Sequence, residues 1–103
     1  MQRLNVVYKL ENVNEVMEEE LKDLVENNLE VKMSSSLKKI YSKGDDVKVL
    51  IRVNVSKEKE GYNGNFKLEY DGKIFEYDRE GFEILADLVN HAFENFKQRV
   101  LAK

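Results

Sequence analysis

The chain has 103 residues, of which 42% are hydrophobic and 36% are charged, as expected for one globular domain. It contains no cysteine, which excludes disulfides, thiolate metal sites and cysteine nucleophiles and favours a cytoplasmic location. No apolar run approaches the roughly 20 residues of a membrane span, so we expect neither a membrane partner nor a signal peptide.

The net charge of −3 is unevenly distributed along the chain. Residues 1–30 carry three basic and eight acidic side chains, whereas residues 31–59 carry eight basic and three acidic ones. The net charge alone argues against a nucleic-acid binder, but its distribution matters more. The basic side chains are concentrated in one stretch.

Apolar and polar residues alternate at the start of the chain, which predicts a first strand that ends near Leu10. Asn14 is a candidate N-cap, and a helical period of apolar residues follows it to about Lys43. Asn27-Asn28 and Ser34-Ser35-Ser36 are weak helix formers inside this long segment. The segment is therefore either one continuous helix, or two helices of which the second is capped by Ser34 or a neighbour.

The second half of the chain predicts a hairpin. Val47–Val55 alternates strictly and indicates a strand, and Phe66–Tyr70 indicates another. Asp71-Gly72 then fits a two-residue hairpin turn, which sets Leu68 opposite Phe75 in the next strand. The same register sets Phe66 opposite Tyr77, so one face of the hairpin is apolar.

A helical period returns from about Gly81, and its apolar residues form one broad stripe as far as Val100. Since only one face of the hairpin is strongly apolar, we predict an α+β fold of order β-α-β-β-β-α, with two helices on one face of a four-stranded mixed sheet. Residues 1–103 form a single domain in this interpretation. The first two strands are parallel, and the two helices run in the same direction, so their C-terminal ends lie at the same edge.

This geometry would bring two basic helix ends together. Such a patch could neutralise several phosphates, although cations at helix C-termini also complement the helix dipole. The residues concerned are Lys32, Lys38, Lys39 and Lys43 on the first helical segment, Lys97, Arg99 and Lys103 on the last, and Lys48 and Arg52 nearby on the sheet.

No catalytic, metal-binding or cofactor-binding arrangement is recognisable, and no small-molecule substrate is expected. His91 is the only histidine, so we expect it to pack or to face solvent. Glu18-Glu19-Glu20 forms an acidic helix face with Asp23 and Glu26, for which a solvated role is expected. The sheet aromatics are expected to pack in the core rather than stack on bases, with Tyr62 outside the hairpin register and free for contact.

Three stretches carry a resemblance to a known family: Val47–Val55, Phe66–Phe75, and Glu80-Gly81 leading into Ile84–Leu88. With the opening Met-Gln-Arg-Leu-Asn, they resemble the hibernation-promoting factor / protein Y family of bacterial ribosome-associated proteins over most of the chain. Double-stranded-RNA-binding domains have a related α-β-β-β-α core. Their basic cluster at the start of the last helix is missing here, where Tyr77–Gly81 reads Tyr-Asp-Arg-Glu-Gly.

The resemblance implies a ribosome-associated translation inhibitor that binds the small ribosomal subunit at the mRNA and tRNA channel and blocks translation sterically, without catalysing a reaction. The alternative is a non-catalytic protein-interaction or regulatory module that uses the acidic face of the first helix. The sequence leaves the oligomeric state open. The rRNA-binding positions that the resemblance implies are Lys38, Lys39, Lys43, Lys48, Arg52, Lys97 and Arg99.

Overall fold

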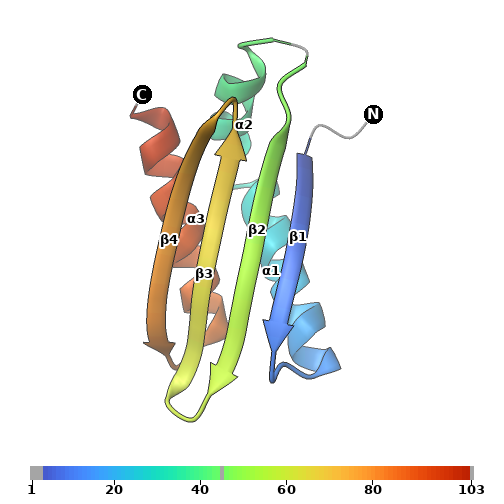
Figure 1. Cartoon of the computed structure of the whole chain (residues 1–103), viewed down its shortest axis with the longest axis vertical. Helices are drawn as coiled ribbons and strands as arrows, with labels where there is room; N and C mark the ends of the chain where they lie inside the picture. The colour runs from blue at the N-terminus through green and yellow to red at the C-terminus, as the bar shows by residue number, and fades with distance from the viewer. Residues whose placement is uncertain (1–3, 45, 103) are drawn as a thin grey trace.

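The computed structural model describes residues 4–44 and 46–102, which form a four-stranded sheet and three helices. The strands lie in the order β1-β2-β3-β4, with β1 parallel to β2 and the other neighbours antiparallel. All three helices lie behind the sheet in Figure 1, and the opposite face of the sheet is turned towards the viewer. The predicted α+β fold is confirmed, with the first helical segment divided in two. The elements are β1 (Leu4–Glu11), α1 (Glu15–Glu30), α2 (Ser34–Tyr41), β2 (Val49–Glu58), β3 (Gly61–Tyr70), β4 (Lys73–Phe82) and α3 (Leu85–Leu101).

The long helical segment begins as its sequence predicts but breaks for a different reason. The side chain of Asn14 accepts a hydrogen bond from the Met17 N–H at 2.9 Å, so Asn14 is the N-cap of α1. The N-cap of α2 is Met33, a neighbour of Ser34 as predicted, but its side chain makes no capping bond in the described part of the chain. The Ser34 hydroxyl instead donates to the carbonyl oxygen of Val31 at 3.2 Å. Met33 is fully buried, so core packing rather than capping holds the break.

The hairpin register is confirmed, because Leu68 pairs with Phe75 and Phe66 pairs with Tyr77. The strands are longer than predicted, since β3 begins at Gly61 and β4 continues to Phe82. Glycine and asparagine disfavour strands, and both are frequent at the start of β3, so local propensity hides this part of the strand. Pairing with β2 on one side and β4 on the other forms it.

The core lies between the helices and the side of the sheet that faces them. Phe66 packs edge-on against Tyr77 at 6.4 Å and against Phe93 of α3 at 6.2 Å between ring centroids. The sheet aromatics thus pack in the core, as predicted. The expectation that Tyr62 is free for contact is wrong. Only 9% of its surface is exposed, and its hydroxyl contacts the Met17 sulfur at 3.7 Å.

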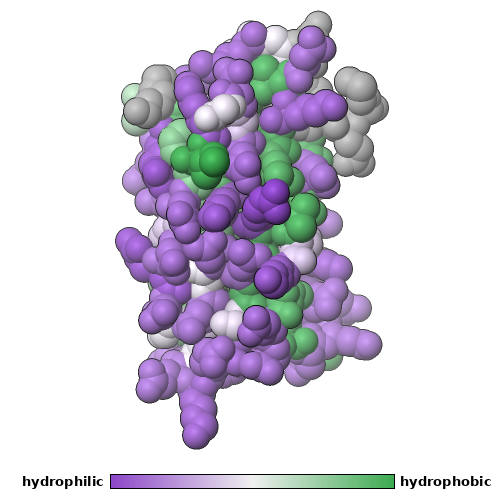
Figure 2. All heavy atoms as spheres, in the orientation of Figure 1, coloured by the Kyte–Doolittle hydropathy of each residue, from purple (hydrophilic) through white to green (hydrophobic). Residues whose placement is uncertain are grey.

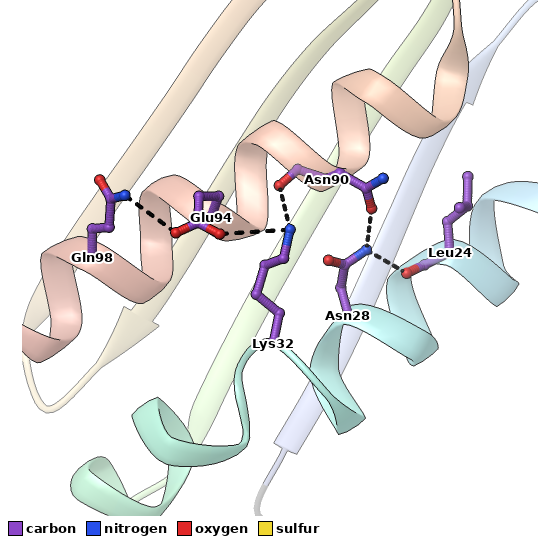
Figure 3. Close-up of polar contacts among 6 residues, drawn as sticks. All are labelled: Leu24, Asn28, Lys32, Asn90, Glu94 and Gln98. Atoms are coloured by element: carbon purple, nitrogen blue, oxygen red, sulfur yellow. Dashed lines mark hydrogen bonds and ion pairs between the residues drawn. The ribbon is translucent and has the colours of Figure 1, made fainter.

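The helices α1 and α3 run parallel, as predicted, because their contacts advance together along both (Figure 3). Asn28 Nδ2 donates to Asn90 Oδ1 at 2.9 Å. Just past the end of α1, Lys32 Nζ donates to the Asn90 carbonyl oxygen at 3.3 Å and pairs with Glu94 at 3.7 Å. The end of α1 therefore lies beside the middle of α3, and α2 continues to the end of the sheet where α3 finishes (Figure 1). Within the described ranges, no helix is long and apolar enough to cross a membrane.

Candidate nucleic-acid interface

Cations gather at the end of the molecule where α2 and α3 finish and β2 begins, at the top of Figure 1. Lys39 Nζ on α2 donates to the carbonyl oxygens of Val100 at 3.1 Å and Leu101 at 3.2 Å, which fixes the end of α2 against the end of α3. Lys48 immediately precedes β2 and so lies at the same end. We call this cluster the basic end; it consists of Lys38, Lys39, Lys43, Lys48, Lys97 and Arg99.

Four members of the basic end have ammonium groups without an internal partner. Among residues 4–44 and 46–102, the side chains of Lys38, Lys43, Lys48 and Lys97 form neither a hydrogen bond nor an ion pair. The first three are exposed and Lys97 is partly exposed. These four can contact phosphates without breaking a contact of the fold.

Lys39 and Arg99, unlike the other four members, have contacts within the fold. The last turn of a helix leaves carbonyl oxygens without intrahelical donors, and Lys39 supplies donors to two of them on α3. Arg99 Nη1 donates to the carbonyl oxygen of Glu76 on β4 at 2.8 Å, and its guanidinium lies 4.9 Å from the centroid of the Phe75 ring. Both residues therefore stabilise the end of α3 as well as adding charge.

Arg52 is not part of the basic end. It lies in the middle of β2, and its side chain is exposed between the buried Ile51 and Val53, so it points away from the helices. There Arg52 Nε pairs with a carboxylate oxygen of Glu69 at 3.0 Å. The structure thus brings six of the seven predicted positions to one end and leaves Arg52 on the other face of the sheet. Lys103 lies outside the described residues.

A shallow hollow at the basic end is lined by Lys43 and Lys48 together with Asp46 and Asp71. The two carboxylates lower the positive potential that the two lysines produce, because the opposite charges line one surface. A phosphate at this hollow would therefore be bound less strongly than the lysines alone would suggest.

The face of the sheet turned away from the helices is mostly hydrophilic (Figure 2). It contains a hollow of about 240 Å³ whose walls include Lys9, Asn54, Asn65 and Asp78. These four residues form one row across the four strands, since each is paired with the next. Amides and charges can donate and accept hydrogen bonds here, but the aromatic rings that would stack bases lie on the helix side.

The remaining chemistry-bearing residues are His91 and the carboxylates outside the basic end. Within the part of the chain that the structure describes, no group of three or more histidines and carboxylates is placed to hold a metal ion. His91 is exposed and packs edge-on against Phe82, with the ring centroids 5.4 Å apart. Its contact with this neighbouring ring agrees with the packing role expected from the sequence.

An acidic stripe lies on the exposed side of α1 and consists of Glu19, Asp23, Glu26 and Glu30. Their spacing of four, three and four residues places them on one face of the helix. Glu18, which the sequence grouped with this face, instead pairs with Lys22 at 2.9 Å. Glu30, one turn beyond Glu26, was not included in the acidic face predicted from the sequence.

The fold and the cation cluster define an α+β domain with lysines and an arginine gathered at one end. Neither the scan of family models nor the search of curated proteins gives a match to the sequence. Among solved structures, the crystal structure of the N-terminal domain of Protein Y from Thermus thermophilus is similar, with a TM-score of 0.59. The similarity covers 97% of this chain and 96% of that chain at 11% sequence identity. At that identity the similarity establishes a shared fold.

Proposed function

We propose that this protein is a cytoplasmic, non-catalytic hibernation factor that binds rRNA of the small ribosomal subunit through its basic end and blocks the mRNA and tRNA channel. The observation that carries the proposal is the joining of α2 to α3 by Lys39, which places the unpartnered lysines at one end. The sequence resemblance to the hibernation-promoting factor / protein Y family and the fold shared with a Protein Y domain support it.

The proposed mechanism requires the domain to bind in a defined orientation, and it requires no catalysed reaction. The Cα atoms span 43 × 28 × 23 Å, with the basic end at one end of the sheet and helix layer. Lysines there would bind rRNA phosphates as point charges, while the acidic stripe on α1 would be repelled by them. The charge distribution would therefore orient the domain, and its bulk would exclude other ligands from the occupied channel.

Charge reversal at the basic end tests the proposal. Lys38, Lys43 and Lys97 are changed together to Glu, while Lys39 and Arg99 remain because they stabilise α3. We expect the variant to fold normally and to lose co-sedimentation with purified small subunits at moderate salt. For the parent, each neutralised phosphate adds about 0.7–0.9 to the magnitude of the slope of log affinity against log salt.

A matched control reverses Lys9, Lys59 and Lys67, which changes the charge equally at positions outside the basic end. This control is expected to bind small subunits nearly as the parent does. Equal binding by parent and basic-end variant would contradict the proposal.

The interaction-module alternative gives the opposite result. If the protein uses its acidic helix face for a protein partner, changing Glu19, Asp23 and Glu26 to Lys abolishes its association, and reversal of the basic end does not. The observation that supports this alternative is the exposure of the acidic stripe, whose carboxylates could contact a protein partner.

A further inference from the structure

A second hollow adjoins the basic end, beside the turn between β3 and β4. Its volume is about 290 Å³. Small-molecule sites measure about 300–1,000 Å³, so this hollow is near the lower limit and suits one base rather than a base pair. Lys48 and Asp71 line both this hollow and the one shared with Lys43, so the two are neighbours. A nucleotide whose phosphate binds Lys43 or Lys48 would therefore have its base beside the second hollow.

Two apolar side chains lie on opposite sides of the second hollow. Leu50 pairs with Glu69, and Glu69 pairs with Ile74, so the three form one row across β2, β3 and β4. Leu50 and the 62% exposed Ile74 alternate with buried neighbours, so both point away from the helices. Figure 2 shows apolar surface near the top of the sheet, over β4 and separately over β2. Adjacent strands lie about 4.8 Å apart, so the backbones at Leu50 and Ile74 are about 9.6 Å apart and a flat ring fits between the side chains.

Arg52 keeps the middle of this row open. It pairs with Lys67 in the strand register, so on the same face it lies further from the β3–β4 turn than Glu69 does. Arg52 Nε pairs with a Glu69 carboxylate oxygen at 3.0 Å, which holds that carboxylate on the side away from the turn. The hollow lies on the side of the turn, between Leu50 and Ile74. Arg52 thus has a positioning role although it is not part of the basic end.

The rim of the hollow has an acceptor and a donor that the fold does not use. Asp71 and Gly72 form the two-residue turn, and both have positive φ, which fixes the backbone beside the hollow. Among residues 4–44 and 46–102, the Asp71 carboxylate and the Lys48 ammonium form neither a hydrogen bond nor an ion pair. A carboxylate only accepts hydrogen bonds, and an ammonium only donates them. Guanine is the base whose Watson–Crick edge has two adjacent donors, N1–H and N2–H, beside the acceptor O6.

We propose that this hollow binds a single unpaired guanine of RNA, with its ring between Leu50 and Ile74. The guanine N1–H and N2–H groups donate to the Asp71 carboxylate, and O6 accepts from the Lys48 ammonium. Apolar side chains hold unstacked bases in this way in other nucleic-acid sites. The inference rests on the proposed function, since it identifies the feature of rRNA that the basic end would select. It also explains why a carboxylate lies among the cations, because Asp71 distinguishes one base from the others.

Fluorescence anisotropy with short RNAs tests the proposal. The probes are labelled nine-nucleotide uridine strands with one guanosine, adenosine, inosine or 7-deazaguanosine at the centre, titrated with the full chain at low ionic strength. We expect the guanosine probe to bind about tenfold more tightly than the adenosine probe. Inosine lacks the N2 amino group, so its probe should bind about threefold to tenfold more weakly than the guanosine probe. The 7-deazaguanosine probe keeps the Watson–Crick edge and should bind as tightly as the guanosine probe.

Two isosteric substitutions separate base recognition from charge. Asp71→Asn and Asp46→Asn each remove one negative charge from the surroundings of the basic end, so both variants should bind the adenosine probe at least as tightly as the parent does. Asn also tolerates the positive φ of position 71, so the turn is retained. Only Asp71→Asn should lose the guanosine preference, because its amide has one acceptor oxygen and directs an NH₂ group towards the guanine donors. Asp46 is the matched control, since it lines only the first hollow.

The apolar sides of the hollow are tested at Ile74. Ile74→Thr keeps the branched shape but removes apolar surface, so it should weaken binding of the guanosine probe by about threefold. Val7→Thr is the control, because Val7 is exposed on the same face of the sheet but does not line the hollow. Equal affinities for these two variants would contradict the position given to the guanine ring.

Three results would overturn the proposal. The first is a guanosine probe that binds no more tightly than the adenosine probe, or does not bind. The second is a guanosine preference that Asp71→Asn retains, and the third is a preference that Asp46→Asn loses equally, which would indicate a general effect of charge. Co-sedimentation with small subunits is measured separately. A guanosine preference without co-sedimentation would support this site and refute the proposed function, whereas co-sedimentation without the preference would refute this site alone.

Discussion

The contact between Asn28 and Asn90 should make a measurable contribution to the register of α1 against α3. Asn28 is 3% exposed, and its Nδ2 donates to Leu24 O at 2.8 Å and to Asn90 Oδ1 at 2.9 Å. A net hydrogen bond contributes about 0.5–1.5 kcal/mol, and a buried group that loses its partner costs about 1–3 kcal/mol. Asn28→Ala should therefore lower the free energy of unfolding by about 2 kcal/mol, and Asn90→Ala by less, because Asn90 is only partly buried.

A double-mutant cycle isolates the direct contact, because both single variants and the double variant are compared with the parent. Urea unfolding followed by circular dichroism should give a coupling energy of about 1 kcal/mol between the two positions. Asn27→Ala is the matched control, since Asn27 is the exposed neighbour of Asn28 and should change stability by less than about 0.5 kcal/mol. A coupling energy near zero would refute the role given to this hydrogen bond (Figure 3).

Three further predictions follow from single positions. Gly64→Ala should lower the free energy of unfolding by about 1–3 kcal/mol, because the new methyl would lie 2.7 Å from Phe66 Cε1 and 2.9 Å from Leu88 Cδ2; unchanged urea unfolding would contradict this close packing. Ser36→Ala should raise stability by about 1 kcal/mol, since Ser36 Oγ is buried without a partner among the described residues; a lower thermal midpoint would show that the hydroxyl is satisfied. In the unfolded chain the Tyr8 phenol ionises near 10.0, but in the folded protein it keeps its proton to about 12, so stability should fall as pH rises through this interval. Tyr8→Phe should make that fall shallower in urea titrations, and an identical pH profile would argue against the raised pKa of Tyr8.

The local chemistry of the sequence determined most of the elements. Asn14 caps α1 because its side chain accepts a hydrogen bond from a backbone N–H of the first turn. Strict alternation in Val47–Val55 gives the buried face of β2. The Asp71-Gly72 turn fixes the hairpin register, because both residues adopt positive φ in a two-residue connection. These features depend on near neighbours in the chain, and so they could be predicted without the fold.

The candidate site was predictable only in part. The parallel course of the helices follows from the order of elements, so a convergence of basic helix ends could be predicted. The sequence could not predict whether a particular cation is available to bind phosphate, because this depends on its contacts with residues that are distant in the chain. Lys39 is bound to the end of α3 and Arg99 to β4, whereas Lys38 and Lys97 have no internal partner among the described residues.

Tertiary structure alone decided the break between α1 and α2, the start of β3 and the position of Tyr62. Met33 ends one helix and precedes the next because its side chain is fully buried, not because a neighbouring residue caps it. Gly61–Asn65 becomes a strand because β2 and β4 lie on both sides of it, and the same pairing buries Tyr62. Periodicity along the chain determines which residues share a face. Which groups meet across the core is determined by the free energy of burying and pairing residues that are far apart in the sequence.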